Sequence, residues 1–125
     1  MTDTYKLHEK AFANVAAYVI MRGDDNLGSI AFKFPRDGAG RLYAYLHIYG
    51  APMVRGFAGG FGYDKQTAAV ADAARKLLKS PECEPLVRGN PAWYVPTLIH
   101  TLAQDGGHHW DNALRAADFQ VYRAV

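Results

Sequence analysis

One segment of the sequence, Arg41–Tyr49, alternates strictly between aliphatic and aromatic side chains. The aliphatic set occupies the even positions and the aromatic set the odd ones: Leu42, Ala44, Leu46 and Ile48 against Tyr43, Tyr45, His47 and Tyr49. Successive side chains of a strand point to opposite faces of a sheet, so this period of two predicts a strand. One face of that strand is expected to be buried and aliphatic, and the opposite face to carry the aromatic rings.

Other segments also have strand character. Val15–Met21 is apolar on both faces, which is typical of a strand that is covered on both sides or lies centrally in a sheet. Ser29–Phe34 alternates between apolar and polar or small residues, and Met53–Ala58 is a short fourth candidate. Alternation returns at the end of the chain, so Phe119–Val125 is predicted to be a closing strand.

From Gln66 to Ala117 the pattern is mostly helical. Val70, Ala73, Ala74 and Leu77 recur at helical spacing, after Asp64 as the expected N-cap. A second helix is expected to start near Pro96 and a third near Trp110. The resulting order, β-β-β-β-α-α-α-β, predicts an α+β fold with about three helices packed on an antiparallel sheet of about four to five strands. Residues 1–125 are expected to form a single domain.

Composition excludes several function classes. The 125 residues include 14 Lys+Arg and 12 Asp+Glu, and a formal net charge of +2 does not by itself indicate nucleic acid or an acidic membrane as the partner. The chain has no apolar stretch long enough to span a membrane and no secretory signal at its start. Cys83 is the one cysteine, so it has no partner for an internal disulfide. A cytoplasmic location without membrane association is therefore expected.

No enzyme motif matches the chain. Gly59–Lys65 is glycine-rich and lies between a predicted strand and a predicted helix, where backbone amides can bind phosphate. Lys65, however, stands where a dinucleotide fingerprint needs glycine, and no Gly-Lys-Ser/Thr follows, so a tight turn is the favoured interpretation. Glu82 and Glu84 flank Cys83 and disfavour the thiolate that a nucleophile needs. No catalytic residue and no cofactor is assigned.

A histidine-rich segment supports one alternative, a metal-assisted hydrolase. His108, His109 and Asp111 lie close together in the sequence, and His100 on the preceding predicted helix could approach them across a glycine turn. Adjacent histidines point in different directions, whereas zinc sites on a helix prefer histidines four residues apart. Helix capping and solvent exposure are therefore the favoured interpretation of these residues, and no metal site is assigned.

The aromatic face of Arg41–Tyr49 is the main candidate for binding. Tyrosines with nearby basic residues, here Lys33, Arg41 and Arg55, resemble a platform on which nucleic-acid bases stack. Tyrosine and arginine are also enriched at protein interfaces. In a third interpretation the predicted helices simply cover this face. The low net charge favours a protein partner over nucleic acid.

Several blocks of the sequence resemble a family of small uncharacterised proteins encoded by bacterial phages and other mobile elements. The blocks are AFANVAAYVI (Ala11–Ile20), FKFPRDGAGRLYAYLHIYG (Phe32–Gly50) and VRGFAGGFGYDKQTAAVADA (Val54–Ala73), with GGFGYDK the most specific part and a further likeness in the closing WDNALRAADFQVYRAV. The resemblance implies a protein that binds and blocks host machinery, including CRISPR effectors. It carries over no catalytic residue.

The sequence thus predicts a non-enzymatic protein that inhibits or modulates a host protein or ribonucleoprotein complex, in the manner of a counter-defence inhibitor. The expected partner contacts are Tyr43, Tyr45, Tyr49, Arg55, Tyr63 and Lys65. A single-stranded nucleic-acid-binding module that uses the tyrosines is an alternative. A homodimer is also left open, because the closing strand could pair across a dimer.

Overall fold

The computed structural model describes residues 12–35, 41–59, 63–80, 94–104 and 109–124. Within these ranges the chain forms, in order, β1 (Phe12–Arg22), β2 (Asp25–Pro35), β3 (Arg41–Ile48), β4 (Val54–Gly59), α2 (Tyr63–Lys79), α4 (Tyr94–Ala103), α5 (Trp110–Ala116) and β5 (Gln120–Arg123). The predicted α+β fold and its element order are therefore confirmed.

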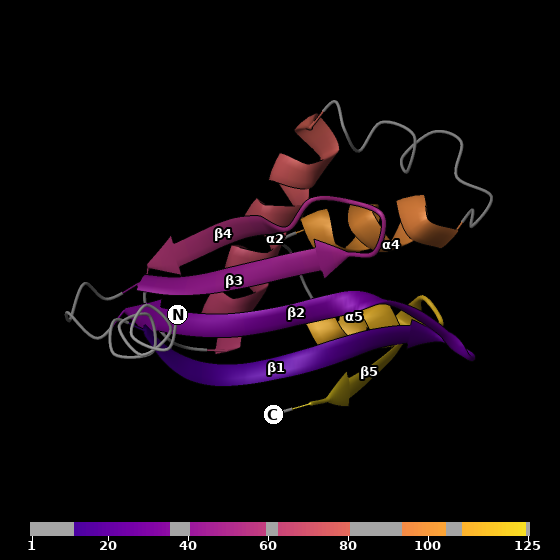
Figure 1. Cartoon of the computed structure of the whole chain (residues 1–125), viewed down its shortest axis with the longest axis horizontal. Coiled ribbons are helices and arrows are strands. Elements are labelled where there is room, and N and C mark those ends of the chain that lie inside the picture. Colours follow the sequence, from indigo (N-terminus) through magenta and orange to yellow (C-terminus); the bar gives the residue numbers. More distant parts are fainter. Residues whose placement is uncertain (1–11, 36–40, 60–62, 81–93, 105–108, 125) are drawn as a thin grey trace, which may run out of the picture.

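The five strands form one antiparallel sheet in the order β4-β3-β2-β1-β5. The described helices α2, α4 and α5 lie together behind this sheet in the view of Figure 1, so the described elements form two layers. The core lies between the layers, where Phe32 and Leu46 of the sheet belong to one buried cluster with Val70, Leu77 and Leu98 of the helices. Burial of this apolar surface is the main term that holds the layers together.

Several element boundaries differ from the predicted ones. β1 lies between β2 and β5, so its central place in the sheet is confirmed, but it begins three residues earlier than Val15. α2 begins at Tyr63, which places Asp64 in the first turn, and its prediction as the N-cap is wrong. α4 begins at Tyr94 rather than near Pro96. Proline is tolerated throughout a first turn because the amides there have no intrahelical acceptor, so its position does not define the first residue.

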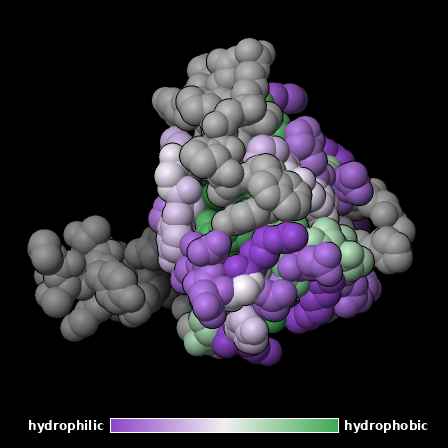
Figure 2. All heavy atoms as spheres, turned by 90° about the vertical axis from the view of Figure 1, so that its right-hand side faces the viewer, coloured by the Kyte–Doolittle hydropathy of each residue, from purple (hydrophilic) through white to green (hydrophobic). Residues whose placement is uncertain are grey.

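The two residues Gly23 and Asp24 join β1 to β2. Gly23 adopts a φ of 59°, which glycine reaches without steric cost and which two-residue hairpin turns require. Its N–H donates to Oε1 of Gln120 at 2.9 Å, so the turn is tied to the start of β5. This end of the molecule faces the viewer in Figure 2, where hydrophilic residues predominate, in agreement with the exposure of Asp24, Asp25 and Asn26.

Helix α2 lies directly on the backbone of β4. A Cβ atom at Gly56 would lie 2.3 Å from the carbonyl oxygen of Ala69 and 2.3 Å from the amide nitrogen of Ala73. Only glycine fits at this contact. On the helix side, the small side chains of Ala69 and Ala73 let the backbone of α2 come close to β4. The approach therefore depends on small residues from both elements.

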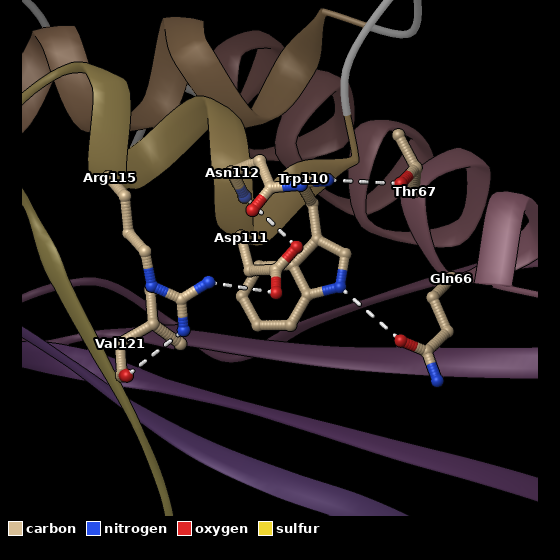
Figure 3. A network of polar contacts seen from close by, with 7 residues as sticks. All are labelled: Gln66, Thr67, Trp110, Asp111, Asn112, Arg115 and Val121. Carbon is tan, nitrogen blue, oxygen red and sulfur yellow. Dashed lines mark hydrogen bonds and ion pairs between the residues drawn. The ribbon is translucent and has the colours of Figure 1, made fainter.

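The buried Trp110 of α5 contacts both the sheet and helix α2. Figure 3 shows its hydrogen bonds to α2. The Trp110 ring lies 5.0 Å from the ring of Tyr18 and 5.5 Å from that of Phe32. Its indole Nε1–H donates to Oε1 of Gln66 at 3.4 Å, and its backbone N–H donates to Oγ1 of Thr67 at 3.0 Å. α5 has no side-chain cap of its own, so the Thr67 hydroxyl on α2 satisfies an amide that the helix start leaves unpaired.

The C-terminal end of α5 determines where β5 begins. Asp118 adopts a φ of 68°, and the N–H of the buried Phe119 donates to the carbonyl of Leu114 at 3.0 Å, as in a Schellman motif. Arg22 at the end of β1 holds this corner, since its guanidinium donates to the carbonyl of Ala117 at 3.3 Å and lies 5.3 Å from the Phe119 ring. The chain thereby turns directly from α5 into a strand beside β1.

The contact between α2 and β4 predicts a strong effect of a single methyl group. Gly56→Ala forces the helix away from the strand, so the free energy of unfolding is expected to fall by about 1–3 kcal/mol, as for other overpacked sites. Chemical denaturation measures this change. Gly59→Ala in the same strand is the matched control, because a Cβ there meets nothing within 4 Å. Equal stability of the two variants would contradict the close packing.

The hydrogen bond from Trp110 to Thr67 predicts a smaller but specific loss. Thr67→Val keeps the side-chain shape and leaves the buried amide unpaired, so the free energy of unfolding is expected to fall by about 1–2 kcal/mol. Thr97→Val on the exposed side of α4 is the control and should change stability little. If thermal melting shows the same change for both variants, Thr67 does not cap α5.

Candidate partner-binding face

The side of the sheet opposite the helices consists of three rows of cross-strand neighbours, which we call the open face. Residues paired across neighbouring strands share a face of the sheet. The rows are His47, Ser29, Val19 and Tyr122; Arg55, Tyr45, Ala31 and Ala17; and Phe57, Tyr43 and Lys33. None of these side chains is buried, and the described helices all lie on the other side (Figure 1).

The predicted alternation of β3 is confirmed by its burial pattern. Leu42, Leu46 and Ile48 are fully buried under the helices, whereas Tyr43 and Tyr45 are only half-buried. The described helices therefore cover the aliphatic face, and the interpretation in which they cover the tyrosines is wrong. The tyrosine face is available for contact with another molecule as far as the described helices and strands are concerned.

Two cations lie over the two tyrosines of β3. The guanidinium carbon of Arg55 is 4.7 Å from the centre of the Tyr43 ring, and Nζ of Lys33 is 5.2 Å from the centre of the Tyr45 ring. Each cation comes from a strand that neighbours β3 and leans diagonally over a tyrosine two positions from its own cross-strand partner. These cation–π contacts hold both charged groups close to the sheet.

Two pairs of aromatic rings in and next to β3 and β4 contact each other at an angle. The Tyr43 and Phe57 rings are 6.1 Å apart at 53°, and the His47 and Tyr49 rings are 5.3 Å apart at 78°. Tilted and edge-to-face arrangements are the favoured geometry for aromatic pairs. The rings thus pack against one another, and they do not form a series of parallel flat surfaces.

The open face carries positive charge without carboxylates. Its three rows contain Lys33 and Arg55 but no Asp or Glu, and Arg41 at the start of β3 is exposed beside them. Within the described part of the chain, neither Lys33 nor Arg55 has a carboxylate at salt-bridge distance. By contrast, Lys76 on α2 pairs with Asp72 at 3.3 Å.

The outer edge of β4 is protected by side chains of α2. Oδ2 of Asp72 accepts from the backbone N–H of Phe57 at 3.1 Å, and Nζ of Lys76 donates to the carbonyl of Arg55 at 2.9 Å. Charged side chains at such positions are a known means of preventing another strand from pairing with a sheet edge. A partner that adds a strand to β4 would have to break both bonds.

The opposite edge of the sheet is protected in the same way. Arg115 of α5 donates from Nη2 to the carbonyl of Val121 in β5 at 3.4 Å, while its Nη1 pairs with Asp111 at 3.0 Å (Figure 3). Both edge strands thus have outward backbone groups engaged by helix side chains. The open face is therefore a better candidate for partner contact than either edge.

Three of the six predicted contact residues, Tyr43, Tyr45 and Arg55, lie together on the open face. Tyr49 follows β3, is 50% exposed and contacts His47, so it extends the same surface. The other two, Tyr63 and Lys65, belong to α2 in the helix layer. The structure therefore does not bring them together with the first four.

The sequence interpretation did not assign Phe57, Lys33 and Tyr122 as contacts. Phe57 and Tyr122 are 52% and 56% exposed, and Lys33 reaches Tyr45. Phe57 could have been found from its position, because it lies two residues after Arg55 and so shares its face. Tyr122 could not, since the pairing of β5 with β1 is a long-range contact.

The histidine-rich segment forms no recognisable metal centre in the described residues. His100 is exposed on α4, His109 precedes α5, and Asp111 is engaged with Arg115. Among the residues that the structure describes, no three His, Cys, Asp or Glu side chains lie together as a metal site would need. His108 and Cys83 lie outside the described residues, as do positions 60–62 of the glycine-rich turn.

The described helices include none that is long and apolar enough to cross a membrane.

Comparison with known proteins finds no matching family model, no similar curated protein and no similar solved structure.

Proposed function

We propose that this chain is a non-enzymatic binding protein that docks a protein partner on its open face. The observation that carries the proposal is the placement of Arg55 over Tyr43 and of Lys33 over Tyr45. One side of each ring is in contact with a cation, so the face presents charged groups together with aromatic rings and hydroxyls. Side chains of another protein match such a surface well.

The composition of the surface supports a protein partner. Tyr, Phe, Met and Arg are enriched at the centres of protein interfaces, and Tyr and Arg dominate their binding energy. On the open face, Phe57 and Tyr122 are each more than half exposed, and the adjoining Tyr49, which contacts His47, is 50% exposed. Exposed large apolar side chains that gather on one surface are a frequent mark of an interaction site.

The resemblance to proteins of phages and mobile elements suggests the setting in which the partner occurs. In that setting the proposed partner is a host protein or ribonucleoprotein complex, which the chain would inhibit or modulate by occupying one of its surfaces. Binding alone is sufficient for such an effect. The open face would then be the inhibitory surface.

Single-stranded nucleic acid is a second candidate, and the positive charge of the open face favours it. Lys33, Arg41 and Arg55 could contact phosphates, and each base stacked on an aromatic ring contributes about 1–3 kcal/mol. The cations over Tyr43 and Tyr45 count against this candidate, because each already occupies one side of a ring on which a base would stack.

Partner capture tests the proposal by comparing an arginine of the open face, Arg55, with an exposed arginine of helix α2, Arg75. The purified chain is used as bait in a bacterial lysate, and a partner recovered by the wild type should be lost with Tyr45→Ala or Arg55→Ala. Removal of a central tyrosine or arginine from an interface costs about 2 kcal/mol or more. Arg75→Ala, at an exposed position of α2, is the control and should retain the partner. Equal recovery by all variants, or no partner for the wild type, would contradict the proposal.

Oligonucleotide binding separates the two candidates. For a protein-binding face, fluorescence anisotropy with single-stranded DNA should show at most weak binding at physiological salt. Any such binding should be insensitive to Tyr45→Ala, since the contacts would be purely electrostatic. A salt-resistant affinity that Tyr45→Ala reduces at least about tenfold would instead support base stacking and the second candidate.

A further inference from the structure

We infer that the partner presents acidic side chains to the open face, and that its carboxylates pair with Lys33 and Arg55. This inference rests on the proposed function and specifies the chemistry of the partner. It starts from two cations that the described part of the chain leaves without carboxylates, on a face that contains none.

The two cations lie at separate positions, one on each side of β3. Lys33 lies on β2 and Arg55 on β4, the two neighbours of β3, so about 10 Å separates their strands. The tyrosine rings of β3 restrict both side chains at 5.2 and 4.7 Å. A side chain that is already held in place loses less conformational entropy when it binds, which favours pairing with a second charged group.

An arginine stacked on an aromatic ring is still able to bind a carboxylate. The guanidinium group is planar, so its N–H donors point outward in the plane of the group while its flat side contacts the ring. A carboxylate accepts two of these donors in a bidentate pair. Arg55 over Tyr43 is therefore suited to an aspartate or glutamate of the partner, with Lys33 as a second point of attraction.

Carboxylates of the chain itself lie elsewhere in the described structure. Asp24 lies in the β1–β2 turn and Asp25 is the first residue of β2, while Asp72 and Asp111 form ion pairs with Lys76 and Arg115 of the helices. Two copies stacked face to face would bring their cations together without a compensating carboxylate in the three rows. Charge complementarity thus points to a different, acidic molecule.

The aromatic residues favour an acidic protein over a simple polyanion. Apolar side chains of a protein can pack against Phe57 and Tyr49, which are 52% and 50% exposed, while its carboxylates reach the cations. A phosphate backbone would satisfy the cations and leave stacking to the bases, although Lys33 and Arg55 already lie over the rings of Tyr45 and Tyr43. An acidic protein surface can therefore contact both the cations and the exposed aromatic rings of the open face.

Charge reversal tests the inference with defined probes. The probes are a polyglutamate peptide, a polylysine peptide of equal length and oligo-dT, each titrated into the isotope-labelled chain. Polyglutamate should shift the amide resonances of Lys33, Tyr43, Tyr45 and Arg55, whereas polylysine should not. The double variant Lys33→Glu, Arg55→Glu should bind polyglutamate at least about tenfold more weakly.

The control variant carries the same change of charge in the helix layer. Arg75→Glu with Lys79→Glu alters two exposed positions of α2 and should leave the affinity for polyglutamate within about twofold of the wild type. Equal weakening by both double variants, or polyglutamate shifts outside the open face, would overturn the inference. Tighter binding of oligo-dT to the same amides would overturn it in favour of nucleic acid.

Capture from a lysate distinguishes failure of this inference from failure of the proposed function. The expected result is that the Lys33→Glu, Arg55→Glu variant and Tyr45→Ala both lose the partner, while circular dichroism shows both to be folded. A partner that Tyr45→Ala loses but the charge-reversed variant retains would leave the proposed function standing and overturn the acidic partner. Retention by both variants would overturn both proposals.

Discussion

The contact between α2 and the backbone of Gly56 is the constraint on which the arrangement of both layers depends. With a Cβ position 2.3 Å from the helix backbone, even one methyl group at this residue would separate the layers. Since α2 lies so close, Asp72 and Lys76 reach the outer edge of β4. Further toward its start, Thr67 meets the first amide of α5 and aligns that helix under β1 and β2. None of the described helices, α2, α4 and α5, lies on the other side of the sheet.

An open sheet face with several aromatic rings carries a risk of self-association. Large exposed apolar patches promote aggregation, and unpaired strand edges promote it further. Helix side chains engage both edges at Arg55, Phe57 and Val121, and two cations lie over the tyrosines of the face. Like charge between copies and occupied edges together favour contact with a complementary molecule over contact with another copy.

The fold was largely predictable because its signals are local. The alternation of Arg41–Tyr49 predicts which side of β3 is buried, and the helical spacing from Val70 to Leu77 predicts α2. Boundaries were less predictable, because Asp64 and Pro96 are compatible with more than one position in a first turn. For the candidate site, Tyr43, Tyr45 and Arg55 lie on one face as expected. Tyr63 and Lys65 were grouped with them, but both belong to α2, whose position in the other layer could not be read from the sequence.

The sequence by itself determined the elements, their order and the chemistry of each strand face, because these depend on residue spacing along a few turns or pleats. Only the tertiary structure decided that the described helices cover the aliphatic side and that Arg55 lies over Tyr43. It also decided that Tyr122 of β5 lies in one of the three rows of the open face. Such contacts join residues far apart in the chain or on neighbouring strands. Their formation depends on how closely whole elements pack, which local periodicity does not encode.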